Sequence, residues 1–238
     1  MMSNLKKYTL DFIVVFLGIS VSFGLNNLNE KRKDRISENN YYENLLEDAR
    51  QDLLNLESQI MVCEYRLNAS NEILILVQNN SSIQEIVTNS FKAVREMSNH
   101  FKPIDATYED LKSSGNLKLI QDNSLKVKIL NYYSSLKGIT ETISNGSQFA
   151  TNVFAEKDNF KKAGWFHLDL VRKSIDSTKV DFEKFNLNQA NRKAFDEQMI
   201  TDAALYTFVN ARLISLYKKI IPDVKKHIKI LEKKLNSH

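Results

Sequence analysis

Glycine and proline are scarce in this chain, and their scarcity limits the folds that it can adopt. The 238 residues include 6 glycines and 2 prolines. Together they make up about 3% of the chain, where roughly 12% is usual. β-Sandwiches, barrels and α/β folds reverse the chain often and need more turn residues than this. The single Cys63 excludes a disulfide scaffold, and 42% hydrophobic residues argue against disorder. We therefore expect an all-α protein with long helices.

An uncharged apolar run, Phe12 to Leu25, lies near the N-terminus. Together with its neighbours from Tyr8 to Leu28 it makes a helix of about 21 residues and ~31 Å, close to the ~30 Å hydrocarbon core of a bilayer. Basic residues flank both ends. We interpret residues 1–30 as an N-terminal tail and transmembrane anchor, and residues 31–238 as a helical-bundle soluble domain. A cleaved signal peptide and a buried core helix are the alternatives.

Asp11 is the ionisable residue at the N-terminal end of this run. A carboxylate inside a membrane is by default a functional hypothesis, for instance a proton site. At the interface beside Lys7 it would instead be hydrated, and its place near the edge of the span favours this interpretation. Four basic residues follow the run and two precede it, so the charge count favours a cytoplasmic C-terminal domain.

Two segments resemble one known family. Residues 11–33, DFIVVFLGISVSFGLNNLNEKRK, follow the anchor pattern of an uncharacterised family of small membrane proteins from Bacteroidetes. That pattern is an acid, an apolar run with Gly-Ile, then Asn-Asn-Trp-Asn-Glu and basic residues. Leu28 stands where the family usually has Trp, and Asp11 where it usually has Glu. Residues 107–133, TYEDLKSSGNLKLIQDNSLKVKILNYY, are similar to the family's second motif.

The resemblance implies a single-pass protein of the bacterial inner membrane, with a helical soluble domain and no assigned activity. It also implies that the soluble domain is periplasmic, which opposes the charge count, and we favour the periplasm. The run and the motif together predict these anchor residues: Asp11, Phe12, Gly18, Gly24, Asn27, Asn29 and Glu30.

Beyond the anchor, apolar residues recur at alternating steps of four and three, the spacing of one helix face. Tyr42 to Val77 follow this spacing and predict one helix over about 31–78. Its start directly after the anchor allows the two to form one continuous helix. Leu125 to Val153 predict a second long helix, for which Asp122 is the expected N-cap.

Shorter helices are expected between the long ones. Ser82 and Glu85 have the spacing of a capping box and predict a helix that runs to about Phe101. A loop with a proline follows. Thr107 is the expected cap of a turn or two that ends at Gly115, a plausible C′ glycine.

A third long helix is predicted at the C-terminus. Its seam runs from Ile200 to Leu235, and a parallel stripe from Phe195 to Ile220 widens the apolar face, so it is expected to touch more than one neighbour. Residues 36–75 carry eight acids and two bases, a net −6, whereas residues 212–238 carry eight bases and two acids, a net +6. We therefore predict that the last helix runs antiparallel to the first and returns towards the membrane, in an elongated antiparallel up-down helical bundle.

The residues that usually carry chemistry are poorly represented. None of the four histidines has a partner at metal-ligand spacing, and Cys63 lies on the first apolar seam, where a small core residue is expected. Phosphate loops and nucleophile elbows are also absent. We therefore expect no enzyme activity, no metal and no cofactor. One irregular region is a candidate partner or ligand surface, or else a hydrophobic plug that closes the bundle: Trp165, Phe166, His167 and Asp169.

A basic tail is the last candidate surface. Its lysines alternate with apolar residues, which favours the solvated face of an amphipathic helix over binding to nucleic acid or acidic lipid. They are Lys218, Lys219, Lys225, Lys226, Lys229, Lys233 and Lys234. The sequence thus predicts a non-enzymatic, membrane-anchored scaffold or accessory subunit, with membrane lipid and a protein partner or homo-oligomer as its contacts. The alternatives are an extracytoplasmic ligand-sensing bundle and a subunit of an ion-driven membrane complex that uses Asp11.

Overall fold

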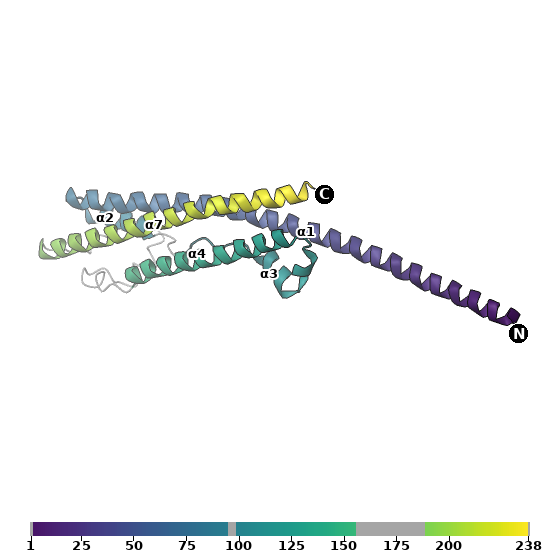
Figure 1. The fold of residues 1–238 in the computed structure, drawn as a ribbon. Coiled ribbons are helices and arrows are strands. Elements are labelled where there is room, and N and C mark those ends of the chain that lie inside the picture. Colours follow the sequence, from purple (N-terminus) through teal and green to yellow (C-terminus); the bar gives the residue numbers. More distant parts are fainter. Residues whose placement is uncertain (1, 95–98, 156–188, 238) are drawn as a thin grey trace.

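Helices are the only regular secondary structure in the part of the chain that the computed structural model describes, residues 2–94, 99–155 and 189–237. In chain order they are α1 (Met2–Gln78), α2 (Ile83–Val94), α3 (Ala106–Ser113), the 3₁₀ helix η1 (Asn116–Leu119), α4 (Asn123–Ala155) and α7 (Gln189–Leu235). The predicted all-α class is confirmed. The second half of α1, α4 and α7 lie side by side in an elongated bundle, from which the first part of α1 extends alone (Figure 1).

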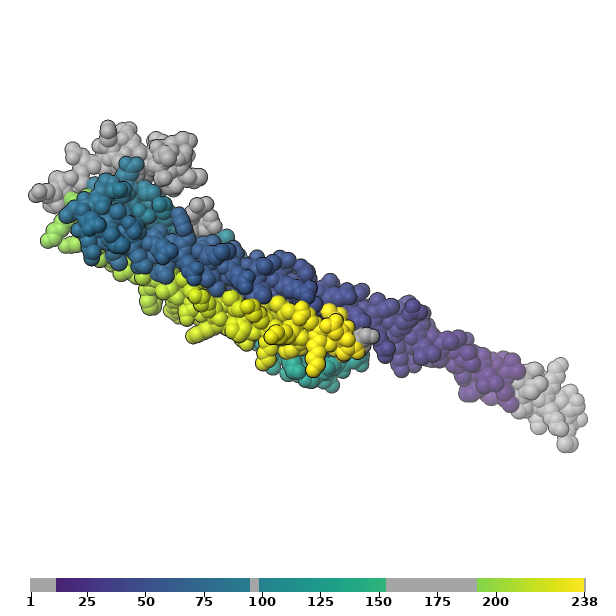
Figure 2. Space-filling model, turned by 90° about the horizontal axis from the view of Figure 1, so that it is seen from above, coloured from purple at the N-terminus to yellow at the C-terminus, as the bar shows by residue number. Residues whose placement is uncertain are grey.

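The first helix is unbroken from the apolar run into the bundle, as expected. α1 has 77 residues and is therefore about 115 Å long at 1.5 Å per residue. Every side chain from Phe12 to Ile36 is exposed, and packing against the rest of the protein begins at Ser37 and Glu38. In the space-filling view this segment is a bare rod that leaves one end of the bundle (Figure 2).

α7 packs antiparallel along α1, which confirms the predicted pairing. Three side-chain contacts between the helices show this direction. They are the ion pairs of Arg50 with Glu232 at 2.8 Å and of Glu64 with Lys218 at 3.7 Å, and the hydrogen bond between Asn71 and Thr207 at 3.3 Å. The two ion pairs are exposed and each is worth at most ~1 kcal/mol. A buried leucine or isoleucine contributes roughly 1.5–3 kcal/mol. The apolar seam therefore stabilises the pair more than charge does.

Three of the charged residues counted in support of this pairing do not lie on the surface. Glu38, Asp52 and Arg66 were included in the count, but all three side chains are buried. Ile200 was also expected on the seam of α7, yet it is 43% exposed. Near the start of α7 the buried positions are Phe195, Met199, Asp202, Ala203 and Tyr206. Their spacing of three and four residues turns the helix so that Ile200 points outwards.

α2 begins with the expected capping box. The Ser82 N–H donates to Glu85 Oε2 at 3.2 Å, and the Glu85 N–H donates to Ser82 Oγ at 3.3 Å. The predicted end near Phe101 was wrong, because the described part of α2 is Ile83–Val94 and residues 99–105 are not helical. Pro103 disfavours a helical conformation just before it. Phe101 is instead buried against Tyr217 of α7, to whose hydroxyl its N–H donates at 3.4 Å.

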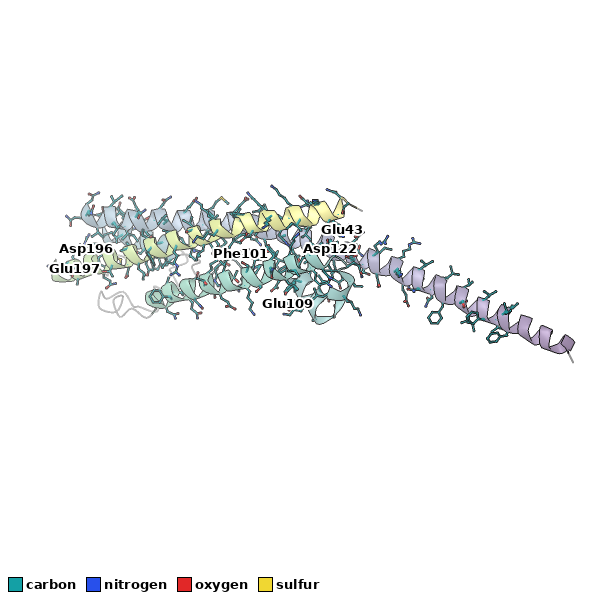
Figure 3. The ribbon with its side chains drawn as sticks, in the orientation of Figure 1. Glu43, Phe101, Glu109, Asp122, Asp196 and Glu197 are labelled. Carbon is teal, nitrogen blue, oxygen red and sulfur yellow. The ribbon has the colours of Figure 1, made fainter. Side chains whose placement is uncertain are left out.

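The turns around α3 confirm one expected residue and correct another. Thr107 is not a cap, because α3 starts at Ala106, with Asp105 at the N-cap position. Gly115 follows α3 with a φ of 72°, the left-handed conformation expected of a C′ glycine. Asp122 caps α4 as predicted, since its Oδ1 accepts from the Leu125 N–H at 3.0 Å. Asp122 and Glu109 lie at the end of the bundle where α1 leaves it, and Asp196 lies at the opposite end (Figure 3).

Loss of this cap should destabilise the bundle by a small and specific amount. Asp122→Ala removes the acceptor for an N–H at the start of α4, so we expect the free energy of unfolding to fall by about 1 kcal/mol. Chemical denaturation of the full chain measures this change. Asn123→Ala, one residue further on and also exposed, is the matched control and should have little effect. Equal losses in the two variants would contradict the cap.

Candidate functional site

The predicted anchor residues lie on the exposed part of α1. Among the described residues, one helix is long and apolar enough to cross a membrane, and none of its apolar window is buried. Asp11 lies on this helix, immediately before the described side chains begin. The remaining predicted anchor residues are exposed: Phe12, Gly18, Gly24, Asn27, Asn29 and Glu30.

A hydrogen-bonded junction lies where α1 enters the bundle. The buried Glu38 accepts through Oε1 from the Tyr42 hydroxyl at 2.6 Å and from the Gln121 N–H at 2.9 Å. The ammonium group of Lys234 lies over the Tyr42 ring, 5.9 Å from its centroid. These contacts join α1 to the start of α4 and to the end of α7.

Tyr41 extends the junction to α3 and η1. Its hydroxyl donates to Asp110 Oδ2 at 2.7 Å and accepts from Asn116 Nδ2 at 2.8 Å. Four elements thus converge on one turn of α1, directly after its bare segment. A link of this kind restrains the angle between the bare segment and the bundle.

A ring cluster is buried next to the junction. Tyr132 of α4 stacks on His227 of α7, with 3.9 Å between ring centroids, and Tyr133 stacks on Tyr108 of α3 at 4.2 Å. Burial lowers the pKa of His227 to about 4, so its ring is neutral at pH 7. In the sequence, His227 is one of four histidines without a partner at metal-ligand spacing. Its position three residues after Val224 and four before Leu231, on an apolar seam, was the signal that it is buried.

Asp52 is a buried acid on the side of α1 that faces the ring cluster. Its Oδ1 accepts from the Ile104 N–H at 2.9 Å, whereas Oδ2 has no hydrogen-bond partner among the described residues. Burial raises the pKa of Asp52 to about 7, although the hydrogen bond from Ile104 opposes this shift. The charge of Asp52 in turn helps to raise the pKa of Tyr132 and Tyr133, after the larger effect of their burial.

The side of α1 that points away from α7 carries exposed apolar residues. Leu54, Met61, Tyr65 and Ile75 are 57%, 64%, 49% and 49% exposed. At 100° per residue they fall within about 80° of the helix surface. Exposed glutamates lie among and beside them: Glu47, Glu57 and Glu72. We call these seven residues the outward face of α1. The charge count revealed the acids, whereas the predicted apolar seams did not include this stripe.

Most lysines of the predicted basic tail have exposed side chains. Lys234 is half-buried over Tyr42. The other six are exposed: Lys218, Lys219, Lys225, Lys226, Lys229 and Lys233. The second candidate surface lies outside the described residues: Trp165, Phe166, His167 and Asp169.

The described residues bring few reactive groups together. They contain no cluster of three or more histidine, cysteine or acidic side chains that could hold a metal ion. Cys63 is buried on the first seam, as expected, and burial raises the pKa of its thiol to about 11. At pH 7 this cysteine is therefore a protonated core residue.

Compared with models of protein families, with curated proteins and with solved structures, the chain matches none. Evidence on its function therefore comes from the structure itself. It comprises a bare apolar helix, a hydrogen-bonded junction with a ring cluster beside it, and an outward face that combines acids with apolar side chains.

Asp52 and His227 should give the protein opposite pH dependences. Between about pH 4 and 7 the folded state holds a proton on Asp52 that the unfolded state has lost, so Asp52 makes the free energy of unfolding fall as pH rises. Between about pH 4 and 6.5 the unfolded state holds a proton on His227 that the folded state lacks, so His227 makes that free energy rise with pH. The two effects oppose each other over most of this window.

Single substitutions should separate these effects. Relative to the unmodified chain, Asp52→Asn should gain stability as pH rises from 4 to 7, and His227→Phe should lose it from 4 to 6.5, each by up to about 1.4 kcal/mol per pH unit. Denaturation of the full chain at several pH values measures both slopes. Asn55→Ala, at an exposed residue of α1 that does not titrate, is the control and should show neither trend. Parallel stability profiles for Asp52→Asn and the control would contradict the account.

Proposed function

We propose that this chain is a non-enzymatic, membrane-anchored helical-bundle protein that holds a partner protein at the membrane as a scaffold or accessory subunit. The observation that carries the proposal is the continuity of α1, whose bare apolar segment and outward face belong to one helix. A bare helix with this many apolar side chains is unstable in water unless lipid or protein covers it. The junction then fixes the orientation of the bundle relative to the lipid or protein that covers the bare segment.

The proposed membrane is a bacterial inner membrane, and the bundle lies on its periplasmic side, as the resemblance implies. Exposed Phe16, Leu17 and Val21 belong to the part of α1 that lipid would cover. The basic residues between this segment and Ser37 are exposed, as headgroup contacts require: Lys31, Arg32, Lys33 and Arg35.

The partner that suits the outward face of α1 is a basic amphipathic helix of another protein. α7 is itself a basic amphipathic helix of this kind. Its apolar seam and lysines pack on the other side of the same acidic helix. From Leu54 to Ile75 the outward face measures about 32 Å, enough for a helix of six turns. A second copy of α1 suits it less, because the same glutamates would face each other.

Charges placed in the bare segment should prevent insertion. Leu17→Arg with Val21→Arg places two guanidinium groups near the centre of the span, each costing about 2.5–3.5 kcal/mol on the insertion scale. With alkaline phosphatase fused after His238, we expect the unmodified fusion to be active in membranes and the double variant to be inactive. Ile36→Arg, at an exposed apolar residue outside the span, should stay active. An inactive unmodified fusion in the membrane fraction would overturn the periplasmic placement, and a membrane-bound double variant would overturn the anchor.

The outward face should crosslink to a basic helix. A photoreactive side chain at Met61 of the full chain, in its own membranes, is expected to give an adduct whose peptide from another protein has alternating apolar residues and lysines. The same group at Val127, a residue of α4 that is 53% exposed where Met61 is 64% exposed, is the control and should not give that adduct. Glu57→Lys with Glu72→Lys should reduce the yield at least fivefold, since each reversal replaces an attraction by a repulsion of up to ~1 kcal/mol. An adduct with a second copy, or a yield that the reversals leave unchanged, would contradict the assignment.

A further inference from the structure

A pocket lies in the groove between α4 and α7, away from the outward face of α1. Its volume is about 270 Å³, and the stacked rings of Tyr132 and His227 form part of its lining. Leu136 and Ile139 of α4 and Ile220 of α7 add apolar walls. Pockets for small molecules start at about 300 Å³, so this one suits a ligand of about a dozen non-hydrogen atoms with an apolar body.

The ring part of the lining presents polar atoms that the fold leaves unused. Tyr132 Oη and His227 Nε2 are buried without a hydrogen-bond partner among the described residues, and the two side chains are only 8% and 3% exposed. Buried polar groups in folded proteins almost always have a partner. The two atoms belong to side chains of different helices that line the same pocket, and each atom is itself covered by the surrounding residues. A polar group of a ligand would satisfy either atom once its ring turns towards the pocket.

The rim of the pocket favours a negative charge. Lys128 of α4 and Lys226 of α7 lie on it, together with Asp223. None of the three forms an ion pair with another described residue. The rim therefore carries one net positive charge, which a single carboxylate balances. Asn131 and Ser135 also line the pocket and supply further hydrogen-bonding groups.

We propose that this pocket is a binding site for a small amphipathic monocarboxylate, with the carboxylate near Lys128 and Lys226 and the apolar body against Leu136, Ile139 and Ile220. A small rotation of the Tyr132 or His227 ring lets a polar atom of the ligand reach Tyr132 Oη or His227 Nε2. Because the site bridges α4 and α7, a bound ligand stabilises the contact between these two helices. The site goes beyond the proposed scaffold role and does not depend on the partner of α1.

Titration of the full chain with 3-phenylpropionate tests the site. The ring nitrogens of the four histidines are followed by NMR after ¹⁵N labelling, and the His227 signal is assigned by its loss in His227→Phe. We expect a saturable shift of the His227 signal with a Kd at or below about 1 mM, as befits a ligand of this size. The neutral 3-phenylpropanamide, of the same shape, should bind at least fivefold more weakly.

Two variants and one control locate the binding. Lys226→Glu should raise the Kd at least fivefold, and Ser135→Trp should abolish binding because the indole fills the pocket. Lys225→Glu makes the same charge change on an exposed neighbour outside the lining and should leave the Kd within twofold. Circular dichroism verifies that each variant is folded. The absence of a saturable shift at roughly tenfold above the expected Kd would overturn the proposal, as would equal losses in the two lysine variants or full binding by folded Ser135→Trp.

Discussion

The antiparallel seam between α1 and α7 is the contact on which the other elements depend. α1 is too long for the short helices that follow it in the chain to cover. A helix gains most of its stability from packing along one face, so α1 needs a long helix from elsewhere in the chain. α7 supplies that packing from the far end of the bundle back to the junction. α2 lies in the space next to the two, and α4 lies along α7 (Figure 1). Without the seam α7 would not be held in place, and both the junction and the pocket would lose the residues that α7 supplies.

The seam also explains why charge is less important to the pairing than the sequence suggests. A net −6 segment and a net +6 segment lie side by side, yet the direct ion pairs between them are exposed. One of them, Arg50 with Glu232, joins a rare base of the acidic helix to a rare acid of the basic helix. Long-range attraction favours the antiparallel arrangement, whereas buried apolar surface stabilises it. The acids that α7 leaves uncovered remain on the outward face for another basic helix.

Local signals in the sequence predicted much of the fold. The capping box of Ser82 and Glu85, the cap at Asp122 and the left-handed Gly115 each depend on a few neighbouring residues, and all three were confirmed. The end of α2 was wrong because Phe101 packs against Tyr217, a residue far along the chain. The spacing of apolar residues along one segment does not reveal a contact with a residue so distant in the chain.

The candidate sites were harder to predict, since they depend on polar residues that lie on apolar faces. Asp52 and Arg66 look like surface charges of an amphipathic helix, and only the packing of other helices over them shows that they are buried. Tyr132 and His227 lie almost a hundred residues apart, so no motif spans them. The outward face was detectable in principle, because Leu54, Met61, Tyr65 and Ile75 share one side of α1 opposite the seam.

The central claim is that one continuous helix joins the membrane span to the bundle. The distance between spin labels at Leu28, in the bare segment, and Leu54, in the bundle, tests this claim in the full chain reconstituted in lipid. Both side chains are exposed, and the buried Cys63 is inaccessible to the label. A continuous α1 predicts a narrow distribution near 39 Å, which is 26 residues at about 1.5 Å each. A broad distribution, or a peak well below this distance, would show that the helix breaks at the junction and would contradict the account.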